Sequence, residues 1–212
     1  MDYTHQLDEY ILQHSEQEPL LLQELYREAH VRLLRPRMVS GHLQGRILSM
    51  LSTMIQPKRI LEIGTFAGYS ALCLAEGLPV DGKLITIEID DEMEDFARSF
   101  FEKSPYKEKI ELLIGDSLQL IPMLNEQFDL VFIDADKRDY CAYYEAVFDK
   151  VLPGGYIFAD NTLWDGKVVE PLLANDKQTE GVLAFNRYIA TDNRVEKVIL
   201  PLRDGLTLIR KK

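Results

Sequence analysis

The stretch RILEIGTFAGYSALCLAEGL, residues 59–78, joins an apolar strand to a helix through a turn bounded by Gly64 and Gly68. Glycines at these two positions let the chain turn sharply and let a ligand approach the backbone beside the helix N-terminus. We expect Ser70 to cap that helix. The alternative is that both glycines serve only the close packing of the helix on the strand.

The rest of the chain repeats this unit. Short apolar segments at 83–89, 109–114, 128–133 and 155–159 alternate with helix-like segments at 71–78, 92–103, 118–124 and 140–151. This alternation predicts an α/β fold with a parallel sheet wrapped by helices, and the apolar strands suit burial on both faces. After a helix at 179–189, residues 194–202 and 205–212 predict a closing antiparallel hairpin.

The chain before residue 58 has a different pattern. Apolar residues recur at helical spacing, and a third helix is expected from about His42 until Pro57 stops it. We interpret residues 1–57 as a helical cap on an α/β core at 58–212. Together they form a single domain covering residues 1–212.

Composition excludes several classes of protein. The chain has 212 residues, 46% of them hydrophobic, and 24 basic against 35 acidic side chains, for a net charge of −11. This charge argues against a broad nucleic-acid footprint, and no apolar stretch approaches the length of a membrane span. Cys73 and Cys141 lack metal-site spacing and are expected to pack in the core. A soluble protein of the reducing cytoplasm is therefore expected.

Acidic and polar residues that could bind a nucleoside stand at the ends of the first strands. Glu88 lies 20 residues beyond Gly68 (88 − 68), where doubly wound folds place the carboxylate that binds ribose hydroxyls. The turn reads E-x-G-x-x-x-G instead of G-x-G-x-x-G, and Glu62 beside it disfavours a diphosphate. A cationic nucleoside such as S-adenosylmethionine fits better. Asp116 and Ser117 supply polar groups where an adenine would lie.

A second cluster follows the strands at 128–133 and 155–159. If these strands are neighbours, Asp134, Asp160 and Asn161 converge, and three oxygen ligands favour Mg²⁺, with Mn²⁺ or Ca²⁺ as substitutes. Lys137 could then accept the proton of a substrate hydroxyl activated by the metal. The alternatives are an ordinary turn at 160–161, helix caps at Asp134 and Asp136, and a solvated Lys137.

The motifs LEIGTFAGYS, IDADK, ADNTLWDGKV and RDGLTLIRKK occur in this order along nearly the whole chain. Together they resemble the cation-dependent O-methyltransferase family, which includes caffeoyl-coenzyme A and catechol O-methyltransferases. The resemblance implies a Rossmann-like class I methyltransferase fold with a seven-stranded, mostly parallel sheet, usually in a homodimer. It also implies transfer of the methyl group of S-adenosylmethionine to a small catechol-like or phenolic acceptor.

The resemblance implies roles for individual positions. The residues expected around the methionine end of S-adenosylmethionine are Met38, Glu62, Gly64, Thr65, Gly68 and Ser70. Glu88 would hold the ribose, Asp116 and Ser117 would border the adenine, and Asp136 would meet the cofactor amino group. The metal ligands would be Asp134, Asp160 and Asn161, and Lys137 would act as general base beside Asp134.

The acceptor is less well defined. Trp164 could stack on an aromatic acceptor, although a lone Trp in a loop also serves packing. Plant-type members of the family that act on coenzyme A esters have an asparagine at the position of Asp165, so that acceptor class is in question here.

Three other functions are open from the sequence. Some bacterial relatives modify a hydroxylated uridine in transfer RNA, and Arg32, Arg35 and Arg37 could contact phosphates, although a net charge of −11 favours a solvated helix end. A nicotinamide-dependent dehydrogenase could use the same sheet, but this chain lacks the G-x-G-x-x-G motif expected of one. A non-catalytic nucleoside-binding protein would have no use for a metal site and a base together.

Overall fold

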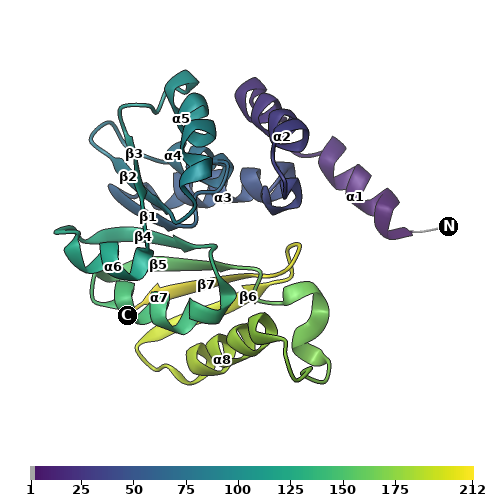
Figure 1. Ribbon diagram of the computed structural model, residues 1–212, viewed down its shortest axis with the longest axis vertical. Coiled ribbons are helices and arrows are strands. Elements are labelled where there is room, and N and C mark those ends of the chain that lie inside the picture. The colour runs from purple at the N-terminus through teal and green to yellow at the C-terminus, as the bar shows by residue number, and fades with distance from the viewer. Residues whose placement is uncertain (1–2) are drawn as a thin grey trace.

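A seven-stranded sheet forms the centre of the computed structural model, which describes residues 3–212 (Figure 1). Met1 and Asp2 of the predicted cap lie outside the described residues. The strand order is β3-β2-β1-β4-β5-β7-β6. Only β7 runs antiparallel to its neighbours β5 and β6, so the prediction of a mostly parallel sheet closed by an antiparallel hairpin is confirmed.

The strands end close to where the sequence predicts. Their bounds are β1 (Arg59–Ile63), β2 (Lys83–Glu88), β3 (Ile110–Ile114), β4 (Phe128–Ile133), β5 (Val151–Asp160), β6 (Val195–Leu200) and β7 (Leu206–Lys211). The expectation of a helix up to residue 151 and a strand from 155 is wrong. Strand β5 begins at Val151, which pairs with Phe128 of β4. The pairing of β5 with β4 then shifts register before Tyr156, and Gly154, with a φ of 81°, lies in this irregular part of the strand.

The helices are α1 (Tyr3–Gln13), α2 (Leu20–Arg32), α3 (His42–Ile55), α4 (Tyr69–Ala75), α5 (Glu94–Lys103), α6 (Ser117–Leu120), α7 (Tyr140–Phe148) and α8 (Lys177–Thr191). Short 3-10 segments are η1 (Pro36–Met38), η2 (Asp91–Met93), η3 (Ile121–Met123), η4 (Lys137–Asp139) and η5 (Trp164–Val169). The predicted cap role of Ser70 is wrong: Gly68 is the N-cap of α4, and Ser70 lies inside the helix.

The two faces of the sheet are covered by different helices. Alternate strand residues such as Ile60 and Leu130 pack with α2, α3, α4 and α5, whereas Leu61 and Val131 pack with α7 and α8. Helix α1 extends away from the body (Figure 1). Among residues 3–212, no helix combines the length and apolar character needed to cross a membrane.

Candidate active site

Four strands end at the same edge of the sheet and carry the predicted site residues. Strand β1 pairs with both β2 and β4, with Ile63 opposite Ile87 and Ile133, and Ile133 in turn lies opposite Ala159 of β5. The chain segments that follow β1, β2, β4 and β5 are therefore neighbours. This confirms the condition on which the convergence of Asp134 and Asp160 depended.

The glycine turn is packed directly against the segment after β4. Gly64 has a φ of 97°, and a Cβ atom there would lie 2.0 Å from the carbonyl oxygen of Asp134. Gly68 has a φ of 82°, and a Cβ atom there would lie 2.6 Å from the ring of Phe101. Gly64 is thus required by its left-handed φ and by backbone packing, and Gly68 by its left-handed φ. Neither contact is the packing of the helix on its own strand, and binding of a ligand at this turn stays a prediction.

Glu62 is fully buried beneath the turn. Its two carboxylate oxygens accept hydrogen bonds from Ser70 Oγ at 2.6 Å and Thr86 Oγ1 at 2.5 Å, and Thr86 lies 2.5 Å from Thr65 Oγ1. Burial raises the pKa of Glu62 to about 8, and the charge of Asp134 adds to this effect. Glu62 therefore supports Ser70 and Thr65 from behind and has no exposed surface of its own.

The acidic side chains after β2 and β3 are held by the backbone. Glu88 accepts hydrogen bonds from the N–H groups of Phe66 at 2.6 Å and Asp90 at 2.9 Å, so it is fixed against the glycine turn. Asp116 is the N-cap of α6 and accepts from Leu118 N–H at 2.9 Å. Their predicted ribose and adenine roles stay predictions.

Lys137 is a buried lysine, so the alternative of a solvated side chain is wrong. It is only 4% exposed, and its Nζ donates to Asp134 Oδ1 at 2.8 Å and to the Tyr140 hydroxyl at 2.6 Å. The Nζ also lies 5.9 Å from the centre of the Trp164 ring. An acid, a phenol and an indole therefore surround one amine.

Tyr140 is a site residue that the sequence analysis missed. Its hydroxyl accepts from Lys137 and lies 3.0 Å from the carbonyl oxygen of Asp160 and 3.2 Å from that of Ile133. The ring is fully buried, and burial together with the charges of Asp134 and Asp160 raises its pKa. Its position three residues after Lys137, at the start of a helix, is the only local signal.

Asp160 lies at the end of β5 with 3% exposure. Its Oδ2 accepts from Gln44 Nε2 at 2.5 Å, and its Oδ1 accepts from the Asn161 backbone N–H at 2.9 Å. Burial, and then the charge of Asp134, raise its pKa to about 7. Gln44, on the buried face of α3, is a second residue that the sequence analysis missed.

Carboxylate and amide oxygens, the ligand types that a hard cation prefers, follow two neighbouring strands here. Asp134 is close enough to raise the pKa of Asp160, so two carboxylates repel one another in a buried place, and a divalent ion would relieve that repulsion. Within residues 3–212 no group of three or more His, Cys, Asp or Glu side chains is arranged to hold a metal. The assignment of Asp134, Asp160 and Asn161 as metal ligands stays a prediction.

Asp136 is occupied by other partners. It caps η4 by accepting from Arg138 N–H at 3.0 Å, pairs with the Arg138 guanidinium, and accepts from Gln178 Nε2 at 3.1 Å. The hydrogen bonds from Arg138 lower the pKa of Asp136. The capping alternative thus holds for Asp136, whereas Asp134 pairs with Lys137. Contact of Asp136 with the cofactor stays a prediction.

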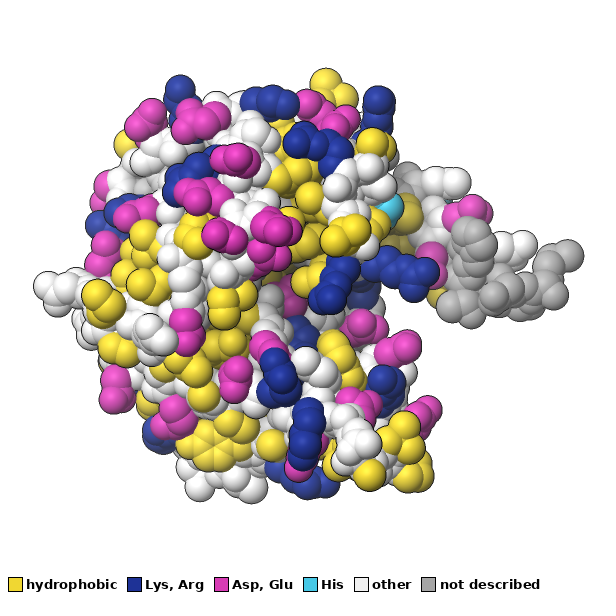
Figure 2. Space-filling view, viewed as in Figure 1, with side chains coloured by type: hydrophobic (Ala, Val, Ile, Leu, Met, Phe, Trp, Pro, Cys, Tyr) yellow, Lys and Arg dark blue, Asp and Glu magenta, His cyan; other side chains and the backbone are white. Residues whose placement is uncertain are grey.

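The remaining predicted residues lie on the segments around this edge. Met38, in η1, is 53% exposed, and Trp164 and Asp165 open η5 with φ values of 48° and 53°. Trp164 Nε1 is buried and has no hydrogen-bond partner among the residues described. Figure 2 shows the molecule hollowed in this region, with acidic and basic side chains at the rim.

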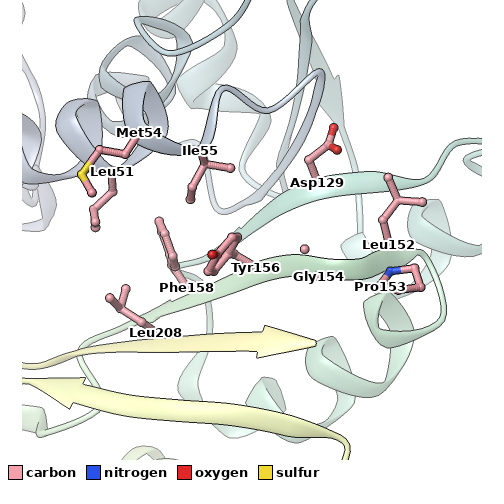
Figure 3. Close-up of a pocket in the computed structure, with 11 residues that line it drawn as sticks. Leu51, Met54, Ile55, Asp129, Leu152, Pro153, Gly154, Tyr156, Phe158 and Leu208 are labelled. Atoms are coloured by element: carbon pink, nitrogen blue, oxygen red, sulfur yellow. The ribbon is translucent and has the colours of Figure 1, made fainter. Parts of the chain in front are cut away.

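A separate groove of about 520 Å³ contains none of the predicted site residues. It lies between α3 and the sheet, and Figure 3 shows Leu51, Met54, Tyr156, Phe158 and Leu208 around it. It is mostly apolar and carries neither the carboxylates nor the lysine of the strand edge.

Comparisons with known proteins agree with this geometry. The profile of the family described as O-methyltransferase matches residues 12–212. The chain is 36% identical to caffeoyl-CoA O-methyltransferase 5 of Nicotiana tabacum over 97% of this chain and 90% of that protein.

Two solved structures have the same fold. The O-methyltransferase TomG of Streptomyces achromogenes, in complex with SAM, is 30% identical with a TM-score of 0.91 and covers 100% of this chain and 99% of that one. The O-methyltransferase of Bacillus cereus, in complex with SAH, is 32% identical with a TM-score of 0.89 and 97% coverage of both chains.

Proposed function

The chain belongs to the O-methyltransferase family and is an S-adenosylmethionine-dependent O-methyltransferase, and we propose that it methylates a small catechol-like or phenolic hydroxyl in a divalent-metal-dependent reaction. The observation that carries this proposal is the buried Lys137 amine, 2.8 Å from Asp134, at the edge where Asp160 and Asn161 also lie. A pure binding protein has no use for this combination.

We assign the metal to Asp134, Asp160 and Asn161, with Mg²⁺ as the ion and Mn²⁺ or Ca²⁺ as substitutes. When bound, such an ion lowers the pKa of an acceptor hydroxyl and fixes its orientation. A catechol suits this arrangement because its two adjacent oxygens allow one to be methylated while the other anchors the ring.

Lys137 is the proposed general base. Its Nζ must lose a proton to act, and the Asp134 and Tyr140 oxygens at 2.8 Å and 2.6 Å hold the nitrogen in place. Burial keeps bulk water from the amine. The acceptor oxygen would attack the sulfonium methyl group in line while Nζ takes the proton of the hydroxyl. The methyl C–S bond would break and S-adenosylhomocysteine would leave, so catalysis would rest on positioning and deprotonation.

The cofactor is assigned to the glycine turn and the strand ends beside it. The turn residues Gly64, Thr65, Gly68 and Ser70 would line the methionine end, with Glu62 behind them and Met38 covering it. The outer residues would be Glu88 at the ribose, Asp116 and Ser117 at the adenine, and Asp136 at the amino group. Glu88 could accept from the ribose hydroxyls and keep its bonds from the Phe66 and Asp90 N–H groups, because each carboxylate oxygen has two lone pairs.

For the acceptor we propose a caffeoyl-type or simpler catechol, stacked on Trp164. Its ring lies 5.9 Å from Lys137 Nζ, which places an aromatic surface beside the proposed base. Asp165 and the net charge of −11 disfavour a polyanionic coenzyme A ester. A transfer RNA acceptor gains no support from Arg32, whose guanidinium lies 5.3 Å from the Phe96 ring centre.

We also propose a cytoplasmic homodimer. Met54, which lines the groove of Figure 3, is 75% exposed, and Met50, one turn before it on α3, is 65% exposed. Val198 on β6 pairs with Leu208 of the groove and is 52% exposed. A second copy of the chain would cover this face. Light scattering of the parent and Met54→Lys would test it, and a monomeric parent would contradict it.

The experiment that tests the function is methyl transfer from labelled S-adenosylmethionine, with Mg²⁺ or EDTA. The acceptors are a catechol panel that includes caffeate and its coenzyme A ester, and hypomodified transfer RNA. We expect Mg²⁺-dependent labelling of a catechol. Labelling of RNA alone would refute the small-molecule acceptor while keeping the chemistry, and labelling unaffected by EDTA would refute the metal requirement.

A further inference from the structure

The turn between β6 and β7 holds the loop after β5, which carries Trp164, in place through backbone hydrogen bonds. The carbonyl oxygen of Asp204 accepts from the N–H groups of Leu163 at 2.6 Å and Trp164 at 3.2 Å, and that of Gly205 accepts from Thr162 at 3.0 Å. The loop that carries Trp164 is therefore fixed to this turn, directly after the end of β5.

The same turn reaches the cap through the Arg203 side chain. Arg203 Nη1 donates to Gln44 Oε1 at 3.0 Å and to the carbonyl oxygens of Val39 and Ser40. Gln44 is only 1% exposed, and its Nε2 donates to Asp160 Oδ2 at 2.5 Å. A continuous chain of hydrogen bonds thus runs from Arg203 through Gln44 to Asp160.

Chemistry fixes which group donates and which accepts in each of these hydrogen bonds. A guanidinium can only donate, so the Gln44 amide must present its oxygen to Arg203 and its NH₂ group to Asp160. The amide then holds Oδ2 while the Asn161 N–H holds Oδ1 at 2.9 Å. Because the amide is neutral, it orients the carboxylate without cancelling the charge that a cation needs.

We propose that Gln44 and Arg203 are positioning residues that hold the Asp160 carboxylate ready for a divalent cation. This inference rests on the proposed function, in which Asp160 is a metal ligand. Partners that orient a ligating carboxylate typically contribute 10- to 100-fold to metal affinity. The competing explanation is that the bonds only fasten the cap to the core, in which case their loss would lower stability and leave metal affinity unchanged.

The test measures Mn²⁺ affinity by calorimetry and Mn²⁺ resonance on the full-length parent, Gln44→Leu, Arg203→Met and the double variant. Affinity for S-adenosylhomocysteine and the melting temperature are measured on the same samples. Ser52→Ala is the matched control, because Ser52 is fully buried on the same helix and donates to Leu74 O at 2.6 Å, away from this chain of bonds.

We expect Gln44→Leu to bind Mn²⁺ about 10- to 100-fold more weakly, while its affinity for S-adenosylhomocysteine and that of the control for Mn²⁺ stay at the parental level. Arg203→Met should weaken Mn²⁺ binding less, and should add nothing to Gln44→Leu. Parental Mn²⁺ affinity in both single variants would overturn this inference and leave the proposed function standing. A parent that binds no Mn²⁺ would overturn the metal site of the proposed function. Arg203 is exposed, so its variant tests the inference even where Gln44→Leu does not fold.

Discussion

The substitution Glu62→Gln should make the stability of the protein less dependent on pH. Burial is the main reason that the pKa of Glu62 rises from 4.5 to about 8. Between these values the folded protein holds the proton and the unfolded chain releases it, so the free energy of unfolding of the parent falls as pH rises through the interval. A glutamine does not titrate, so the variant should lose this part of the slope.

The interval from 4.5 to about 8 corresponds to about 5 kcal/mol. Relaxation around the charged group reduces this value, so we expect the variant to gain roughly 2–5 kcal/mol on the parent between about pH 5 and about pH 9. The site should tolerate the amide, because the Ser70 and Thr86 hydroxyls can each rotate to donate or accept.

The assay is urea unfolding of the parent and the variant over a pH series, followed by circular dichroism. Glu92→Gln is the control, because this carboxylate is exposed. The difference in unfolding free energy between Glu62→Gln and the parent should grow with pH, while that of the control should stay constant. Parallel pH profiles for Glu62→Gln and the parent would refute the assignment of a proton to Glu62 in the folded protein.

Three further substitutions test the strand edge. Asp160→Ala should abolish metal-dependent turnover and leave S-adenosylmethionine binding largely intact; equal activity in mutant and parent would remove the metal assignment. Lys137→Ala should lower kcat by at least about 100-fold with a much smaller effect on cofactor affinity, and a parental rate at neutral pH would remove the base role. Gly64→Ala should weaken cofactor binding and lower the melting temperature, because its Cβ would lie 2.0 Å from the Asp134 carbonyl oxygen; unchanged calorimetry would contradict this.

The sheet and the residues at its edge could be predicted because both depend on local patterns. Apolar runs gave the strands, and the polar residues that end them marked the edge where parallel strands meet. Lys137 illustrates the limit, since nothing in IDADK indicates that its amine is buried between Asp134 and Tyr140. Burial of a charged group depends on which elements pack over it, and the local sequence does not contain that information.

Contacts between distant segments could not be predicted. Gln44 and Asp160 are 116 residues apart in the chain, and no periodicity links a helix residue to a strand end at that separation. The prediction that Ser70 caps α4 was wrong for a related reason. Its residue type favours helix caps, but a buried Glu62 offered a stronger partner at 2.6 Å, and Gly68 in a left-handed conformation took the cap position.

Topology alone brings the loop after β1, to which we assign the cofactor, beside the loop after β4, which carries Lys137. From β1 the chain adds β2 and β3 on one side of the sheet and then β4 and β5 on the other side. Strands β1 and β4 are therefore parallel neighbours although two strands separate them in sequence. The helix after β1, α4, packs on one face of the sheet, and the helix after β4, α7, packs on the other. In open α/β sheets a ligand binds at such a switch point, so we expect the cofactor and the acceptor between these two loops.

The two loops are in contact where they leave the sheet, because the Asp134 N–H donates to the Ile63 carbonyl oxygen at 2.9 Å and a Cβ atom on Gly64 would lie 2.0 Å from the Asp134 carbonyl oxygen. The backbone thus sets the spacing between the cofactor turn and the segment that carries Lys137. Side chains such as Gln44 and Tyr140 then adjust the carboxylate and the amine within that fixed frame. Substitutions that shift this backbone contact, such as Gly64→Ala, should impair both cofactor binding and turnover. Substitutions of side chains such as Gln44 and Tyr140 should lower turnover and leave cofactor affinity near the parental level.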